Sequence, residues 1–150
     1  MIRIKVGQRA ECIASRMDCS SLYISQKLAT PDEITDIVEI SRARNAVLDV
    51  TGALVALQHW FAQILEGSGG SIDTLMTSIS PDRRHRDVQI LVYEDIKERQ
   101  FPDWTLAYNG SAHFVDGLIE VLAVRTGATL VPYHLHRLIQ GIAEFTRRLH

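Results

Sequence analysis

The sequence lacks any long apolar run. Its apolar stretches are far shorter than the roughly 18–20 residues that a membrane-spanning helix needs, so we expect no membrane segment. The N-terminal stretch Ile2–Val6 is also too short for the core of a secretion signal, and Arg9 and Glu11 follow soon after it. These absences favour a cytoplasmic protein.

Neither sign of charge is in large excess. The 16 Lys and Arg residues nearly balance the 18 Asp and Glu residues, which gives a formal net charge of -2. Proteins that bind nucleic acid or an acidic membrane surface through their electrostatic field carry a basic excess. The composition therefore gives no electrostatic reason to expect either partner.

Cysteine is scarce, with Cys12 and Cys19 as the only two, and their spacing matches no metal-binding motif. We interpret them as reduced thiols of a cytoplasmic protein and predict no metal site. What the sequence does contain is 150 residues with 46% hydrophobic and 23% charged side chains. This profile is typical of one soluble domain with a substantial core.

The order of the predicted elements is β-α-β-β-α-β with one further strand. Thr30, Pro31 and Glu33 form a capping-box signature at the start of the first helix. The polar pair Gln58-His59 separates two apolar strands, which predicts an antiparallel hairpin. The predicted strands are Ser21–Ser25, Val50–Leu57, Trp60–Gly67, Val88–Glu94 and Trp104–Tyr108, the helices run from Pro31 to about Asn45 and from about Ser71 to Ile79, and residues 80–87 form a charged loop.

This order predicts an α+β, ferredoxin-like βαββαβ(β) sheet. We expect a flexible N-terminal extension at residues 1–20, with a natural start at Met17 as one explanation, then a sheet domain at 21–110 and a helical segment at 111–150. The strands are apolar on both sides, which is typical of a sheet covered on both faces. We expect the two helices between strands to cover one face and two C-terminal helices to cover the other.

Three polar residues stand where a plain core would have apolar ones. Gln63 and Tyr23 are each in the middle of a strand, and Asn45 is at the end of the first helix. A buried amide without a partner costs about 1–3 kcal/mol, so Gln63 needs a hydrogen-bonding neighbour. Taken singly, each residue has a structural interpretation: a tyrosine bonded to a backbone carbonyl, a helix C-cap, and a glutamine that reaches the sheet edge.

Taken together, the three residues predict a ligand groove. In a ferredoxin-like sheet the first and third strands of this order are neighbours, so Tyr23 and Gln63 point into the groove between the two helices. Ile37 and Ile79 would line that groove, and Asn45 is within reach of it. Two facing aliphatic side chains with polar groups at one end suit a flat heteroaromatic ligand with a polar edge.

Two further sequence features bear on this groove. The run DRRH follows the second helix, and its default interpretation is a solvated loop, but in a ligand groove Arg84 would be a fixed donor and His85 a further polar contact. Trp104 precedes Leu106 by two residues, so the two share one strand face, which alone indicates core packing.

Several short motifs occur together and in order: SLYISQ, the helix that ends in Asn45, VTGAL, FAQILEG, DRRH and RQFPDW. Together they resemble the BLUF family, blue-light sensors that use flavin, over Leu22 to Tyr108. The resemblance implies that Gln63 bonds the flavin ring near N5 and O4. It also implies that Tyr23 bonds this glutamine and supplies an electron and a proton to the excited flavin.

For the remaining site residues, the resemblance implies that Asn45 holds the pyrimidine edge of the ring and that Arg84 is a further donor there. It implies an aliphatic sandwich of Ile37 and Ile79 around the ring. It matches Trp104 to the family's tryptophan in the last strand, whose position in or out of the pocket is linked to signalling. Leu106 departs from the family's usual methionine, and leucine lacks the sulfur that accepts hydrogen bonds weakly.

The resemblance implies a cytoplasmic blue-light photoreceptor of the short BLUF type, with FAD, FMN or riboflavin as cofactor and no catalytic domain of its own. A separate effector, such as a cyclic-di-GMP phosphodiesterase or a transcriptional regulator, would receive the signal, and self-association is expected. Two rival functions remain. An RNA-binding module would need exposed stacking aromatics and basic character, and a small enzyme using Arg84 and His85 would need a nucleophile–base pair.

Overall fold

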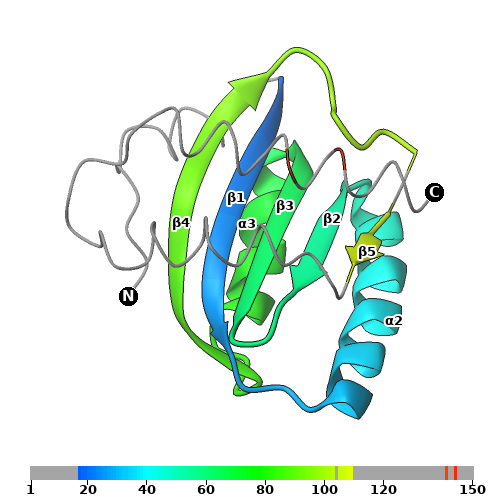
Figure 1. Ribbon diagram of the computed structural model, residues 1–150. Helices are drawn as coiled ribbons and strands as arrows, with labels where there is room; N and C mark the ends of the chain where they lie inside the picture. The colour runs from blue at the N-terminus through cyan, green and yellow to red at the C-terminus, as the bar shows by residue number, and fades with distance from the viewer. Residues whose placement is uncertain (1–16, 104, 110–140, 142–143, 145–150) are drawn as a thin grey trace.

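The structure, a computed structural model of the chain, describes residues 17–103, 105–109, 141 and 144. The order of its elements confirms the ferredoxin-like α+β fold, with a fifth strand after the β-α-β-β-α-β unit (Figure 1). The elements are β1 (Asp18–Lys27), α2 (Pro31–Leu48), β2 (Thr51–Ala56), β3 (Trp60–Ser68), α3 (Gly69–Ile79), β4 (His85–Ile96) and β5 (Ala107–Asn109).

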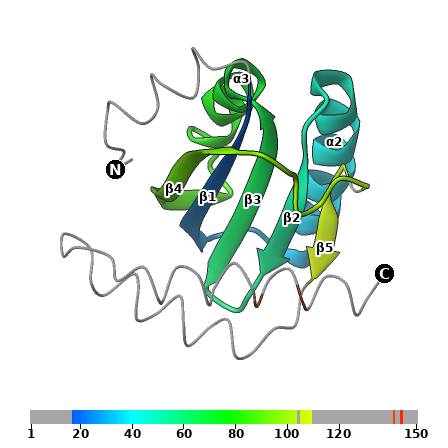
Figure 2. The ribbon, with the colours of Figure 1, turned by 90° about the horizontal axis from the view of Figure 1, so that it is seen from above.

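The five strands form one sheet in the order β4-β1-β3-β2-β5. β1 and β3 are antiparallel neighbours in its interior, β2 and β3 form the predicted hairpin, and β5 runs parallel to β2. Figure 2 shows α2 and α3 on the same face of the sheet, as predicted. Leu22, Ile24 and Ile64, whose side chains point to the opposite face, are also buried. The two C-terminal helices predicted for that face lie outside the described residues.

Two strands are longer than their sequence patterns predict. β1 begins at Asp18 rather than Ser21, because Asp18 pairs with Ser68 of β3 and with Ile96 of β4. Residues 18–20, predicted to belong to the extension, are therefore part of the sheet. β4 begins at His85, inside the predicted charged loop, because residues 85 and 86 pair with the end of β1. Charged side chains do not prevent this pairing, which uses only the backbone.

Helix α2 begins at the predicted cap. The Thr30 hydroxyl accepts from the Glu33 N–H at 3.3 Å, and the Glu33 carboxylate accepts from the Thr30 N–H at 3.1 Å. The helix runs to Leu48, three residues beyond the predicted end, and Asp49 terminates it in a left-handed conformation with φ 54°. Asn45 is thus inside the last turn rather than at the C-cap. Helix α3 also begins earlier than predicted, because Ser68 is its N-cap.

The core on the helical face consists of two groups of buried side chains, and Tyr23 belongs to the first and Phe61 to the second. Residues of both groups line the cavity between the two helices, with Tyr23 from the first group and Phe61 from the second. The first group lies under α3 and includes Tyr23, Leu65, Ile72, Leu75, Met76, Val88 and Ile90, and the second lies under α2 and includes Ile34, Val38, Leu54, Ala56, Phe61 and Leu106.

No helix among the described residues is long and apolar enough to cross a membrane. No group of three or more potential metal ligands occurs in the described ranges either. Cys19 is buried and forms no disulfide, and its sulfur lies 3.5 Å from the Asp95 carboxylate. Cys12 lies outside the described residues.

Gly52 allows β2 and β3 to approach closely. A Cβ at this position would lie 1.9 Å from the Ile64 carbonyl oxygen, which belongs to the backbone of β3 and cannot rotate away. We expect Gly52→Ala to lower the free energy of unfolding by about 2 kcal/mol or more, because overpacking forces the strands apart.

Urea unfolding of this variant beside Gly70→Ala provides the measurement and its control. A Cβ at Gly70, in the first turn of α3, would meet nothing within 4 Å. The helix propensity of alanine should leave Gly70→Ala as stable as the wild type or more stable, by up to about 1 kcal/mol. Equal stability of Gly52→Ala and the wild type would contradict the account of the hairpin.

Candidate functional site

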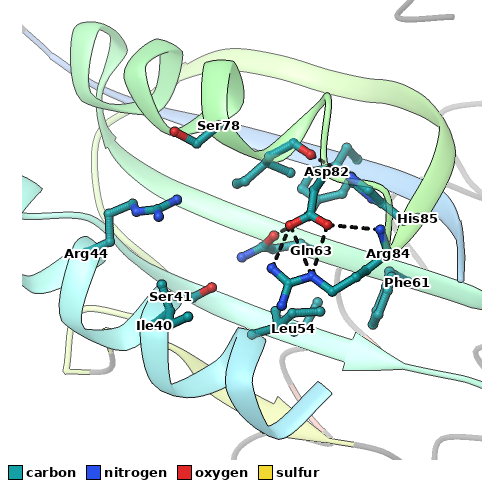
Figure 3. Close-up of a pocket in the computed structure, with 13 residues that line it drawn as sticks. Ile40, Ser41, Arg44, Leu54, Phe61, Gln63, Ser78, Asp82, Arg84 and His85 are labelled. Atoms are coloured by element: carbon teal, nitrogen blue, oxygen red, sulfur yellow. Dashed lines mark hydrogen bonds and ion pairs between the residues drawn. The ribbon is translucent and has the colours of Figure 1, made fainter. Parts of the chain in front are cut away.

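A cavity opens between α2 and α3 over the middle of the sheet (Figure 3). Its volume is about 750 Å³ when the part open to solvent is included. Six of the residues singled out in the sequence lie around it: Tyr23, Ile37, Gln63, Ile79, Arg84 and His85. The structure thus brings together the phenol, the amide and the aliphatic pair that the sequence predicts to face one groove. The other lining residues are Ile40, Ser41, Arg44, Leu54, Phe61, Ser78 and Asp82.

Tyr23 and Gln63 form the polar floor of this cavity. They are directly opposite each other in the pairing of β1 with β3, and each is 4% exposed. The Tyr23 hydroxyl donates a hydrogen bond to Gln63 Oε1. Burial, and then the negative charge of Asp82, raise the pKa of Tyr23 above its ordinary value, so the phenol stays a hydrogen-bond donor at neutral pH.

The other end of the Gln63 amide points toward the ligand space. Gln63 Nε2 makes no hydrogen bond within the part of the chain that the structure describes. An acceptor placed in the cavity would give this donor a hydrogen bond. The cavity thus has aliphatic side chains, Ile37 and Ile79, in its lining and polar groups at its floor, which is the chemistry that a flat ring with a polar edge needs.

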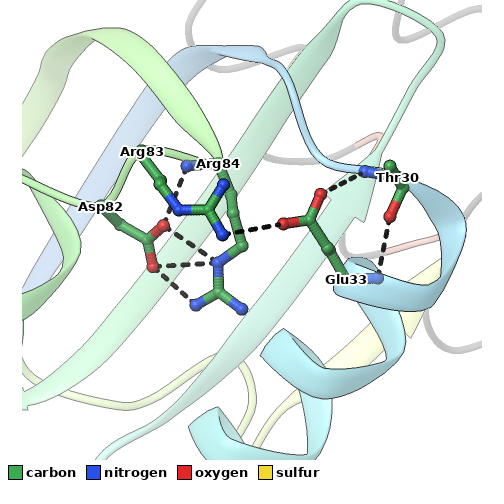
Figure 4. A network of polar contacts seen from close by, with 5 residues as sticks. All are labelled: Thr30, Glu33, Asp82, Arg83 and Arg84. Atoms are coloured by element: carbon green, nitrogen blue, oxygen red, sulfur yellow. Dashed lines mark hydrogen bonds and ion pairs between the residues drawn. The ribbon is translucent and has the colours of Figure 1, made fainter.

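Asp82 and Arg84 form a two-pronged ion pair at the mouth of the cavity (Figure 3). Arg84 Nε and Nη2 lie 2.9 and 2.6 Å from the two carboxylate oxygens, and the Arg84 backbone N–H donates to Oδ1 at 2.9 Å. This geometry holds the guanidinium in one orientation. In Figure 4 the neighbouring Arg83 reaches Glu33 of α2 at 3.8 Å, but Arg83 is 88% exposed, so that pair contributes little to stability.

His85 is fixed by two hydrogen bonds within the protein. Its Nε2 lies 2.6 Å from the Ile79 carbonyl oxygen, and its Nδ1 lies 2.7 Å from Ser25 Oγ. A carbonyl only accepts, so Nε2 carries a proton. A polar contact from His85 to a ligand would require one of these bonds to break. Its ring also meets the edges of Tyr23 and Phe61, which makes it a part of the cavity wall.

Asn45 does not line the cavity. It is 1% exposed, and its Nδ2 donates to the Thr105 carbonyl oxygen at 2.7 Å. Arg42, one turn earlier, donates to the Leu106 carbonyl oxygen at 3.1 Å. These bonds attach α2 to the segment that enters β5, where Leu106 is buried in the core under α2. Trp104 lies outside the described residues.

Ser41, Arg44 and Ser78 were not singled out from the sequence as site residues, and Asp82 was noted only as part of the run DRRH, although all four line the cavity. A signal for two of them was present, because Ser41 and Arg44 follow Ile37 by four and seven residues, which places all three on one helix face. Ser78 and Asp82 carry no comparable periodic signal. Their position depends on where α3 ends.

Asp82→Asn is expected to remove an acid-sensitive part of the stability. Hydrogen bonds from the Arg84 side chain are the main cause that lowers the pKa of Asp82 from 3.8 to about 2. A folded-state pKa below the unfolded value stabilises the protein above the unfolded pKa, and this contribution disappears as the pH falls toward the folded value. The wild type should therefore lose more stability than Asp82→Asn when the pH is lowered from about 6 to about 3.

Urea unfolding at both pH values measures this difference. Asp103→Asn is the control, because Asp103 is exposed and no ion pair involves it among the described residues. It should follow the wild type. Equal losses of stability in the wild type and Asp82→Asn would show that the Asp82–Arg84 pair does not stabilise the fold.

Comparisons with known proteins agree with this geometry. The family model "BLUF: Sensors of blue-light using FAD" matches residues 19–107. The chain is 36% identical to photoactivated adenylate cyclase subunit beta of Euglena longa over 87 residues, which is 56% of this chain and 10% of the relative. It is 38% identical to subunit alpha of Euglena gracilis over 82 residues, 53% of this chain and 8% of the relative. The chain thus spans about a tenth of the length of these curated relatives.

Solved structures match over more of the chain. The dark-state structure of BlrB, a BLUF protein, superposes with a TM-score of 0.66 and 30% identity, covering 85% of this chain and 96% of BlrB. A bacterial light-regulated adenylyl cyclase superposes with a TM-score of 0.64 and 30% identity, covering 83% of this chain and 36% of the cyclase. The family match covers more than half of the sequence and includes Tyr23 and Gln63. The chain therefore belongs to the BLUF family, sensors of blue light that use FAD.

Proposed function

We propose that the cavity between α2 and α3 holds the flavin ring and that Tyr23 and Gln63 form the light-driven switch. The observation that carries this proposal is the buried hydrogen bond from the Tyr23 hydroxyl to Gln63 Oε1 at the cavity floor. Gln63 Nε2 would then donate to the ring near N5 and O4, and Ile37 and Ile79 would hold the ring from its two sides. The family description names FAD, and FMN and riboflavin carry the same ring.

Arg84 and Asn45 differ in how readily they would contact the ring. Arg84 lines the cavity and is already oriented by Asp82, so it would donate to a ring carbonyl without further ordering. The Nδ2 group of Asn45 has two protons, and one of them is used by the Thr105 carbonyl. Asn45 does not line the cavity, so we propose that its side chain turns toward the ring when flavin binds and that the second proton then holds the pyrimidine edge. Flavin binding would then be coupled through Asn45 to the segment that enters β5.

Bound flavin supplies absorption of blue light and an excited ring that accepts an electron. Tyr23 would supply an electron to the excited ring, its hydroxyl proton would pass to Gln63 Oε1, and Gln63 Nε2 would release a proton to the ring. Gln63 then rotates or changes tautomer, and Tyr23 recovers its electron and proton. Rotation exchanges the positions of Oε1 and Nε2, so that Nε2 donates to the Tyr23 oxygen and Oε1 faces the ring. Both orientations leave the amide hydrogen-bonded, which is what a two-state switch requires.

We propose that the signal passes to a separate protein and that this chain has no catalytic activity of its own. This chain covers 96% of BlrB, which is described as a BLUF protein. In the Klebsiella pneumoniae BlrP1 structures, by contrast, the chain matches 24% of a longer protein whose description includes cyclic diGMP. A cyclic-di-GMP phosphodiesterase or a transcriptional regulator in the cytoplasm is our candidate effector, and a homo-oligomer our candidate assembly, by family analogy.

Leu106 and Trp104 are the candidate signalling residues. Leu106 is 2% exposed and packs under α2, so a change in the sheet that moves β5 would also move a core contact. Leucine fills a volume similar to that of the methionine usual in the family, and it lacks the sulfur acceptor. We therefore propose that Leu106 transmits the signal through packing rather than through a hydrogen bond.

Two measurements test the proposed function. The purified protein should be yellow and should release about one flavin per chain on denaturation, because no covalent bond holds the ring. A colourless protein that takes up none of FAD, FMN and riboflavin would refute it. Affinity capture from the source cells, in blue light and in darkness, should recover an effector whose yield depends on light. Light-independent recovery would refute the separate-effector proposal alone.

A further inference from the structure

Glu66 is a buried carboxylate that the proposed switch does not use. It is 1% exposed and follows Gln63 by three residues on β3, so its side chain points to the sheet face opposite the cavity. Its two oxygens accept the backbone N–H groups of Gln100 and Phe101 at 2.9 and 2.8 Å. Burial raises the pKa of Glu66, against the effects of these two hydrogen bonds and of nearby Arg99.

Arg99, like Gln100 and Phe101, lies in the connection between β4 and β5. Its side chain attaches this connection to two more strands. Its Nε donates to the Asp18 carboxylate at 2.8 Å, its Nη1 to Thr51 Oγ1 at 3.3 Å and its Nη2 to the Asp49 carbonyl oxygen at 3.0 Å. The Arg99 side chain is 15% exposed, so these bonds are partly shielded from water. Residues 99–101 are therefore held to the first residues of β1 and β2 and to Glu66 near the end of β3.

The same stretch of chain is held at its other end by helix α2. Arg42 and Asn45 donate to the carbonyl oxygens of Leu106 and Thr105. Figure 1 shows this connection crossing one end of the sheet between β4 and β5. We call residues 99–106 the output segment, because they include the candidate signalling residues Trp104 and Leu106. One end of the output segment is fixed to the strand that carries Gln63, and the other to the helix that lines the cavity.

We propose that Glu66 is a positioning residue that fixes the dark-state location of the output segment and so couples movement of β3 at Gln63 to that segment. The inference rests on the proposed function, in which Gln63 is the light-driven switch. A carboxylate that accepts two adjacent N–H groups tolerates little displacement, because both bonds lengthen together. A shift of β3 would therefore either pull the output segment along or release it.

Glu66→Gln tests this inference in the flavin-loaded protein. The glutamine side chain has nearly the same shape, but it offers one acceptor and places an NH2 donor against the second N–H group. The light-driven red shift should remain, because Glu66 does not line the cavity. Dark exchange of the Gln100 and Phe101 amides should become about tenfold faster, and dark recovery about threefold slower or more, as expected when one hydrogen bond is lost.

Glu98→Gln is the matched control. It removes the same charge from the same connection, and Glu98 is exposed and makes no hydrogen bond among the described residues. It should behave as the wild type in every measurement. The decisive readout is the change in amide exchange of residues 99–106 between darkness and light. The wild type and Glu98→Gln should show this change, and Glu66→Gln should lose it.

The outcomes separate this inference from the proposed function. A wild type without any red shift would refute the proposed function. A normal red shift, together with wild-type recovery and a retained light-dependent exchange in Glu66→Gln, would overturn the role of Glu66. If Glu66→Gln does not fold, Arg99→Lys provides a second test. Lysine keeps the positive charge but cannot make the three guanidinium hydrogen bonds of Arg99 together. Unchanged light-dependent exchange in Arg99→Lys would overturn the inference as well.

Discussion

Gln63→Leu is expected to abolish the light-driven red shift of the flavin absorption while the flavin stays bound. Leucine is close to glutamine in size but neither donates nor accepts a hydrogen bond, so Tyr23 loses its partner and the ring loses its donor. The aliphatic walls made by Ile37 and Ile79 remain in place. Because the switch consists of the amide itself, we expect less than about a tenth of the wild-type amplitude to remain.

The measurement combines flavin content per chain with the difference between the spectra in light and in darkness. Gln58→Leu makes the same chemical change at an exposed position between β2 and β3 and should keep the full red shift. A Gln63→Leu protein with a normal red shift would show that the amide is not the switch. A Gln63→Leu protein without flavin would show instead that Gln63 is needed for binding.

Tyr23→Phe should block the photocycle at its first step. The ring keeps its place in the core under α3, but the hydroxyl that gives up the proton is absent. Gln63 Oε1 also loses its only hydrogen-bond partner among the described residues, so the free energy of unfolding should fall by about 1–3 kcal/mol. Flash excitation followed by absorption measures the yield of the red-shifted state, which should be under about a tenth of the wild-type yield.

Tyr93→Phe is the matched control for this change. Tyr93 is 3% exposed, packs in the same core, and its hydroxyl donates to the Gly69 carbonyl oxygen at 3.3 Å. Its substitution should lower stability by a similar amount and leave the photocycle intact. A normal yield of the red-shifted state in Tyr23→Phe would mean that another group supplies the electron and proton.

Local signals in the sequence predicted much of the fold. The capping box at Thr30 and the hairpin around Gln58-His59 depend on residues within a few positions of each other, and both are present. The pairing of Tyr23 with Gln63 followed once the strand order was inferred, because the central strands of this topology are neighbours.

The features that were not predicted depend on residues far apart in the chain. β4 extends to His85 only because the end of β1 is available as a partner, and no pattern within residues 80–87 indicates that. Asn45 is directed by the Thr105 carbonyl, 60 residues later. Glu66 gave one local signal, a charge between Leu65 and Gly67 in a buried strand, but its partners at residues 100 and 101 belong to a connection without periodicity.

The absorption spectrum of the wild-type protein, recorded in darkness, under blue light and again in darkness, tests the central claim most directly. A hydrogen-bonding switch at Gln63 leaves the ring intact, so the flavin band should move slightly to the red in light and return in the dark. Loss of the band in light would instead indicate a covalent adduct. An unchanged spectrum would show that Tyr23 and Gln63 do not form a light-driven switch, and either result would contradict the account.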